Sequence, residues 1–425
     1  MQITIHRGFR QIGGCITEIS SNAGTKILID LGHNLPGTND GKDELANKDA
    51  VKELTKGCSA ILYTHYHGDH VDLFPYVDDV KQYIGPGAKE VMTCKYEALA
   101  RHDEKFKEAL EKIASFDTYH MAYELHIGDI SITPFMVSHS AFDAYMFLLK
   151  AEGKTIFHTG DFREHSYLGK GLMKIIPKYI APQNVDVIIT EGTMLSRESE
   201  LVKHENELQN KAVELLKRPD HKFTFVLCSS IDMEHLATLQ KASERANRLF
   251  IVDGYQKAVL DIFTKYSGSK SDLFDFSQAK VNTEKYEDFF TKGFCMPVRL
   301  SMKEYVGKML FKLNSPKQSS LIYSMWKGYI KKDTPTYNPE IQNLIDMFGD
   351  RFDYLHTSGH ATMETIREVC EIINPTTAII PIHRDKISEL DAALEGDDEL
   401  INKIIRKSGT FNDVKIVIKQ EDSTI

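Results

Sequence analysis

Residues 64–70 read Thr-His-Tyr-His-Gly-Asp-His and follow directly on a short apolar run, residues 59–63. The run is typical of a strand, and the polar residues form the turn that leaves it. Three imidazoles and a carboxylate so close together cannot all point apart. Divalent ions such as zinc take neutral imidazole and carboxylate ligands at roughly 2.0 to 2.2 Å. The stretch therefore predicts a metal site with His65, His67, Asp69 and His70 as ligands, and a His-rich surface turn is the alternative.

Three more ligand-type residues close apolar runs elsewhere in the chain. His139 ends ISITPFMVSHS, Asp161 ends TIFHTGD, and His383 ends TTAIIPIH. Any one of them alone is more often a satisfied structural polar residue. Their joint occurrence at the ends of strand-like runs indicates that they join the same site.

Length and composition limit the class of protein. A chain of 425 residues suits two domains, or one large domain with an insertion. No eighteen apolar residues follow one another, the start lacks a basic region followed by an apolar run, and the six cysteines stand singly. We expect a cytoplasmic protein that does not bind membranes. A net charge of -9 argues against a surface wholly devoted to nucleic acid, but it allows a local basic cleft.

The pattern along the chain predicts an inserted domain. Residues 1–195 carry mostly short strand-like runs with a longer helical stretch at 95–115, which predicts a layered α/β domain. Residues 196–350 have the strand-helix-strand rhythm of a parallel sheet, and their part 264–300 looks like a helix-rich cap. Short strand-like runs return in 351–425, so we expect this segment to complete the first domain.

These motifs resemble the metallo-β-lactamase superfamily, and within it the β-CASP nucleases such as ribonuclease J. Asp30 in ILIDLG, the 65–70 cluster, His139 and Asp161 match the superfamily's metal-site motifs in order. Glu191 in ITEGT, His360 in HTSGHA and the PIHR motif are similar to the three motifs that the β-CASP group adds. The resemblance implies an αββα sandwich of the metallo-β-lactamase fold with an inserted β-CASP domain.

The resemblance also implies roles for the site residues. His65, His67 and His139 would hold one metal ion, Asp69, His70 and His383 the other, and Asp161 would bridge them. Asp30 would orient a ligand. Zinc is the expected metal of both ions, with manganese as the alternative. Asp69 would also orient the attacking water, and His360, paired with Glu191, would give a proton to the leaving oxygen. The structural alternatives are that Glu191 caps a turn and that His360 only binds phosphate.

An inserted domain of this kind favours RNA as the substrate. We predict a ribonuclease that cleaves single-stranded RNA, and the alternative is a small-molecule phosphodiesterase, lactonase or thioesterase of the same fold. Ser229, Ser230 and Ser358 are the candidate phosphate-binding hydroxyls, together with His360; alternatively, the serines near 230 and Asp232 simply cap the helix that follows. Arg163 is one of several basic residues that are candidates for lining an RNA path, and a homo-oligomer is compatible with the sequence.

Overall fold

The structure is a computed structural model, and it describes residues 1–38, 42–197, 202–283, 286–313, 316–385 and 390–419. The chain divides into two compact units. Unit 1 comprises 1–164, 168–200 and 359–425, and unit 2 comprises 165–167 and 201–358. The chain thus leaves unit 1, builds unit 2 and returns.

Unit 1 contains two β-sheets. The first has eight strands in the spatial order β19 (Gly409–Phe411), β20 (Val414–Ile418), β1 (Gln2–Arg7), β2 (Ile16–Ser20), β3 (Lys26–Ile29), β4 (Ala60–Leu62), β5 (Lys81–Ile84) and β6 (Asp117–Thr118). The second has six in the order β18 (Ala378–Ile382), β11 (Val187–Glu191), β10 (Lys154–His158), β9 (Ala144–Ala151), β8 (Ile130–Val137) and β7 (Leu125–Ile127). The two strands that follow unit 2 in the chain and pair with earlier strands are β18, parallel to β11, and β20, parallel to β1.

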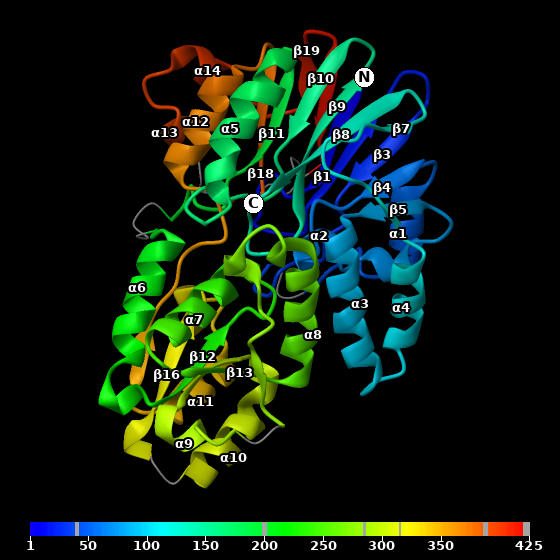
Figure 1. Cartoon of the computed structure of the whole chain (residues 1–425). Coiled ribbons are helices and arrows are strands. Elements are labelled where there is room, and N and C mark those ends of the chain that lie inside the picture. The colour runs from blue at the N-terminus through cyan, green and yellow to red at the C-terminus, as the bar shows by residue number, and fades with distance from the viewer. Residues whose placement is uncertain (39–41, 198–201, 284–285, 314–315, 386–389, 420–425) are drawn as a thin grey trace. The chain divides into compact units, whose positions relative to one another are not determined.

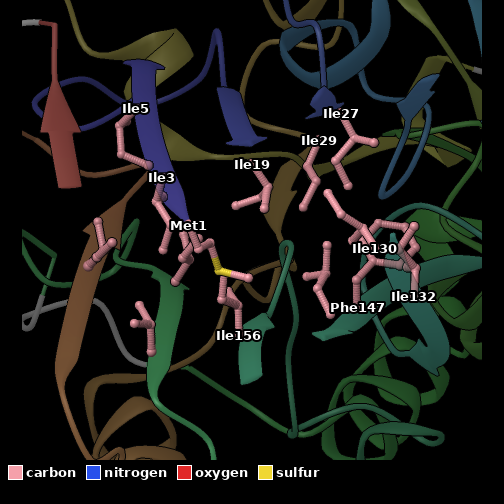
Figure 2. Packing of buried hydrophobic residues seen from close by; sticks show 14 of the residues in the cluster. Met1, Ile3, Ile5, Ile19, Ile27, Ile29, Ile130, Ile132, Phe147 and Ile156 are labelled. Atoms are coloured by element: carbon pink, nitrogen blue, oxygen red, sulfur yellow. The ribbon is translucent and has the colours of Figure 1, made fainter. Parts of the chain in front are cut away.

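The main core of unit 1 fills the space between its two sheets. Alternate residues of β1 and β3 of the first sheet point into it, as do alternate residues of β8 to β11 of the second. Figure 2 shows Ile19 and Ile29 of the first sheet beside Phe147 and Ile156 of the second. Phe147 is fully buried, and its ring makes an edge contact with Tyr119 at 5.3 Å.

The second sheet is buried on its other face as well. There Leu148, Phe157 and Ile188 pack with Ile366 and Val369 of α12. Burial on both faces explains why these strands read as continuous apolar runs. In Figure 1, α5, α12, α13 and α14 gather on the same side of this part of unit 1. The helices of unit 1 are α1 (Lys48–Thr55), α2 (Gly68–Val71), α3 (Pro86–Ala100), α4 (Phe106–Ala114), α5 (Leu172–Ile175), α12 (Met363–Ile373), α13 (Leu390–Ala393) and α14 (Asp398–Asn402).

Unit 2 is built on one parallel sheet. Its order is β14 (Lys280–Val281), β13 (Leu249–Val252), β15 (Phe294–Val298), β12 (Phe223–Cys228), β16 (Ser319–Ser324) and β17 (Phe352–Tyr354), and each neighbouring pair runs parallel. Its helices are α6 (Glu205–Leu216), α7 (Met233–Arg245), α8 (Gly254–Phe263), α9 (Phe289–Lys292), α10 (Lys303–Leu313) and α11 (Pro339–Asp346). This is the strand-helix-strand architecture that the sequence indicates.

Three details differ from the sequence-based expectations. The helical stretch at 95–115 is two helices, α3 and α4, with a turn between them. The segment 264–300 is not simply helical, because it contains β14 and the buried strand β15. The run 352–354 forms β17, which pairs with β16 in the sheet of unit 2, and the chain returns to unit 1 at Gly359.

Replacing Phe147 by alanine tests the core between the two sheets. We expect Phe147→Ala to lower the free energy of unfolding by about 3–5 kcal/mol, because the change leaves a cavity among residues that cannot collapse to fill it. The measurement is urea unfolding followed by far-ultraviolet circular dichroism. Tyr123→Ala is the control, since this side chain is 75% exposed and its loss should change the value by less than about 0.5 kcal/mol. Equal effects of the two substitutions would contradict this packing.

Candidate metal centre

Six strand ends of unit 1 carry the predicted site residues. Asp30 follows β3, the 65–70 turn follows β4, and His139 follows β8. Asp161 follows β10, Glu191 is the last residue of β11, and His383 follows β18. Asp30 and His383 both have left-handed backbones, with φ of 61° and 52°. Such a conformation is unusual for residues other than glycine and turns each side chain sharply from its strand.

The turn after β4 is held against the loop after β3. The carboxylate of Asp30 accepts hydrogen bonds from the amide of Thr64 at 2.7 Å and from its hydroxyl at 2.9 Å, and lies 2.8 Å from Nδ1 of His70. The two segments are so close that a Cβ on Gly32 would lie 1.7 Å from the carbonyl oxygen of Asp69. Only glycine fits at position 32, and the orienting role of Asp30 stays a prediction.

The first group of ligand-type side chains consists of His65, His67 and His139. One nitrogen from each lies within 4.8 Å of the others. Nδ1 of His139 is 2.6 Å from the carbonyl oxygen of Gly359, so it carries the ring proton and leaves the Nε2 lone pair facing Nδ1 of His67 at 3.1 Å. Nδ1 of His67 can donate its proton to that lone pair or, in the other tautomer, offer a lone pair to a cation beside it.

The second group consists of Asp69, His70, His383 and Asp161. Nε2 of His383 lies 3.1 Å from Asp69 Oδ2 and 3.6 Å from Asp161 Oδ2, and Nε2 of His70 lies 3.2 Å from the same Asp161 oxygen. Nδ1 of His383 is 2.7 Å from the hydroxyl of Thr193. That bond fixes the ring so that Nε2 faces the carboxylates. Asp161 Oδ2 is also 3.8 Å from His139 Nε2, so it lies near both groups.

These spacings fit bound divalent ions. Atoms that lie 2.1 Å from a common ion at tetrahedral angles are about 3.4 Å apart, close to the spacings of both groups. Nε2 of His65 and Nε2 of His70 are buried and make no hydrogen bond. Buried polar atoms without a partner are rare and costly, and a metal ion is one way to satisfy them. The seven residues of these two groups, here called the ligand cluster, therefore suit a metal centre.

Protonation within the ligand cluster also suits a cation. Burial lowers the pKa of His65 and His139 well below its usual value and that of His67 to about 4, so these imidazoles are neutral at pH 7. Burial alone would raise the pKa of Asp69 and Asp161, but neighbouring histidines hold both well below the usual range. The carboxylates are therefore charged, and they raise the pKa of His70 and His383 against the effect of burial, so a bound cation would have to displace protons from these two rings. Neutral imidazole and ionised carboxylate are the forms that bind metal ions.

Residues 25–245 match a family model described as a β-lactamase superfamily domain, which is more than half of the chain. The chain belongs to the metallo-β-lactamase superfamily. It is similar to "Ribonuclease J" of Sinorhizobium meliloti (strain Sm2011 / Rm2011 / 2011), with 20% identity over 402 residues, which are 88% of this chain and 68% of that protein. It also shares its fold with a solved protein of unknown function from Enterococcus faecalis V583, with a TM-score of 0.67, 18% identity and coverage of 95% and 97% of the two chains.

Next to the ligand cluster of this superfamily member lies a histidine-carboxylate pair. Nδ1 of His360 is 2.8 Å from Oε2 of Glu191. Oε1 of Glu191 accepts hydrogen bonds from the amides of Phe162 at 2.8 Å and Ala361 at 3.4 Å. Glu191 is buried, whereas the His360 side chain is 20% exposed. A buried and anchored carboxylate thus orients an imidazole that solvent can reach.

The candidate phosphate-binding serines all lie in unit 2. The hydroxyl of Ser229 accepts a hydrogen bond from the amide of Ile231 at 3.3 Å, and the N-cap of α7 is Asp232, whose side chain accepts from the amide of His235 at 3.1 Å. The carbonyl oxygens of Ser230 and Ser358 accept hydrogen bonds from side chains. Capping of α7 therefore falls to Asp232, and a phosphate role for the three serines stays a prediction.

Other residues of the superfamily site were missed or misjudged in the sequence. Thr193, which holds His383, and Thr64, which binds Asp30, were not singled out, since their roles depend on contacts across the fold. Thr193 stands two residues after Glu191 in ITEGT, and this proximity was the available signal. Arg163, one of the candidates for lining an RNA path, is fully buried, which argues against that role. No described helix is long and apolar enough to cross a membrane.

Replacing Asp30 by asparagine tests the orienting carboxylate. Asparagine tolerates the left-handed backbone and can still accept from the amide of Thr64, but its NH₂ group opposes a protonated Nδ1 of His70. The proton would move to Nε2 and remove that nitrogen as a ligand. We expect metal affinity to fall by about 10- to 100-fold in competition with a coloured chelator. Asp129→Asn, at an exposed carboxylate of unit 1, should leave it unchanged. Equal affinities of the two variants would show that Asp30 does not orient a ligand.

Proposed function

We propose that this protein is a metal-dependent ribonuclease that hydrolyses phosphodiester bonds in single-stranded RNA. The observation that carries the proposal is the ligand cluster, in which two groups of buried imidazoles and carboxylates meet around Asp161. The similarity to ribonuclease J, which extends over both units, favours RNA over the small-molecule substrates that the same cluster would serve. In this proposal unit 2 is the β-CASP domain.

The ligand cluster would hold two divalent ions. His65, His67 and His139 are the proposed ligands of one, Asp69, His70 and His383 those of the other, and Asp161 is shared. Bound there, the ions would supply an activated water as nucleophile and positive charge beside the phosphate oxygens. We take zinc as the metal because imidazole is the commonest ligand here, and manganese as the alternative.

The protein's own groups would position the water and supply a proton. Asp69 has a second carboxylate oxygen that can accept a hydrogen bond from the attacking water. His360 would donate its proton to the ribose oxygen that leaves. Glu191 supports this role, because a carboxylate bonded to Nδ1 holds the ring in place and leaves Nε2 to face the leaving oxygen.

The compartment follows from the cysteines. All six lie in the described part of the chain and are free thiols. Reduced thiols and an RNA substrate both fit the cytoplasm, where we place the enzyme.

Incubation with end-labelled RNA tests the proposal directly. We expect protein loaded with zinc or manganese to cleave single-stranded RNA, and His67→Ala/Asp69→Ala protein to leave it intact, because that variant removes one ligand from each group. Circular dichroism of the variant checks that it is folded. RNA with a 5′-monophosphate and RNA with a 5′-hydroxyl are compared, since a preference for the monophosphate would support a phosphate site at Ser229, Ser230 and Ser358.

Cleavage of neither RNA nor single-stranded DNA with either metal would contradict the nuclease. The same preparations are then tested with small phosphodiesters, lactones and thioesters. Hydrolysis of one of these, lost in the double variant, would establish the alternative function.

A comparison of leaving groups tests His360 as the proton donor. We expect His360→Ala to slow RNA cleavage by roughly 10²- to 10⁴-fold. It should slow hydrolysis of a p-nitrophenyl phosphodiester far less, because that leaving group departs without a proton. His126→Ala is the matched control, since His126 pairs with Glu124 at 3.0 Å but on the exposed surface of unit 1. The same loss on both substrates would show that His360 has another role.

A further inference from the structure

A buried cysteine adjoins the ligand cluster. Cys15 directly precedes β2 and is 1% exposed. Its amide donates a hydrogen bond to the carbonyl oxygen of Asp69 at 2.9 Å, and its own carbonyl oxygen accepts one from the amide of Gly32 at 3.1 Å. The backbone of Cys15 is therefore tied to a ligand residue on one side and to the loop after β3 on the other.

The Cys15 sulfur lies within ligand distance of two histidines. Sγ and one nitrogen each of His70 and His383 are all within 4.8 Å of one another. Nδ1 of His70 is bound to Asp30 and Nδ1 of His383 to Thr193, which leaves Nε2 as the ligand nitrogen in both rings. Nε2 of His70 is buried and makes no hydrogen bond. That nitrogen faces the Oδ2 atoms of Asp161 and Asp69 at 3.2 and 3.9 Å without a hydrogen bond, so an ion between these side chains would satisfy it.

The wall behind the sulfur is built from a glycine. Gly8 has φ of 101°, and a Cβ there would lie 3.1 Å from Sγ of Cys15. The carbonyl oxygen of Gly8 accepts a hydrogen bond from the amide of His383 at 2.6 Å. Gly8 therefore contacts both the thiol of Cys15 and the backbone of His383, and its missing side chain leaves room for the sulfur. Among the described cysteines, Cys15 is the only one that belongs to a metal-compatible group.

We propose that Cys15 binds, as a thiolate, the ion that Asp69, His70 and His383 hold. This proposal rests on the metal centre of the proposed function. Burial raises the pKa of the free Cys15 thiol, so its proton would leave to solvent only in exchange for the ion, to which the sulfur would donate a lone pair. A soft sulfur ligand favours zinc over manganese, which prefers oxygen ligands. Cys15 would therefore select the metal of this site.

Cobalt substitution tests the proposal by spectroscopy. Thiolate bound to Co²⁺ gives a strong near-ultraviolet charge-transfer band, which imidazole and carboxylate ligands do not give. We expect wild-type protein with two Co²⁺ ions to show the band and Cys15→Ala protein to lack it. Cys370→Ala is the matched control, because Cys370 is a buried cysteine of unit 1 outside the ligand cluster, and it should retain the band.

X-ray absorption of the zinc form gives a second measurement that needs no variant. A Zn–S distance of about 2.3 Å is expected beside Zn–N and Zn–O distances of about 2.0 to 2.2 Å. Two bound ions without any sulfur signal in the wild type would overturn the Cys15 proposal and leave the hydrolase intact. Protein that binds no metal would overturn both.

Discussion

The carboxylate of Asp30 is the interaction on which the site depends. It accepts hydrogen bonds from the amide and the hydroxyl of Thr64 and lies within hydrogen-bonding distance of Nδ1 of His70. One buried group thus fixes both ends of the 65–70 turn. The left-handed backbone at Asp30 turns the carboxylate out of line with β3. Left-handed backbone costs free energy in a residue with a Cβ, and the surrounding hydrogen bonds must offset that cost. The arrangement is typical of a functional site, in which a side chain is held in place at a cost in local backbone free energy.

Other parts of unit 1 hold the ligands in the same manner. Thr193 and Gly359 each bind the outer nitrogen of a ligating ring, of His383 and His139 respectively. Nε2 of His65 and Nε2 of His70, in the same cluster, have no hydrogen bond, which is a high-energy state for buried polar groups. The apolar core between the two sheets supplies the rigid frame that keeps them there. Stability and function are coupled at these strand ends.

The ligand-type residues were accessible to sequence reasoning because each closes an apolar strand, and strand ends of a sheet meet at its edges. Contacts between distant segments could not be predicted from the sequence. Neither the bond of Thr193 to His383 nor the approach of Cys15 to His70 leaves a local sequence pattern.

The strand β15 was missed in a segment with few clear periods, and Pro297 argues against a central strand. It is tolerated because the pairing of β15 with β13 ends at Cys295, before the proline. The turn between α3 and α4 was missed because its residues, 101–105, are all charged or polar and include no glycine or proline, so they read as the exposed face of one continuous helix.

The order in which the ligands occur along the chain bears on synthesis by the ribosome. Six of the seven residues of the ligand cluster have been synthesised when the ribosome reaches residue 161. The carbonyl group that fixes His139 belongs to Gly359, and the last ligand-type residue is His383, so both are synthesised much later. All of unit 2 emerges between residue 161 and Gly359. Parallel pairing of β18 with β11 and of β20 with β1 closes long loops, which is slow relative to local folding. A nascent chain therefore carries an incomplete cluster throughout translation of its middle third. The full set of ligand-type residues therefore exists only after all of unit 2 has been made.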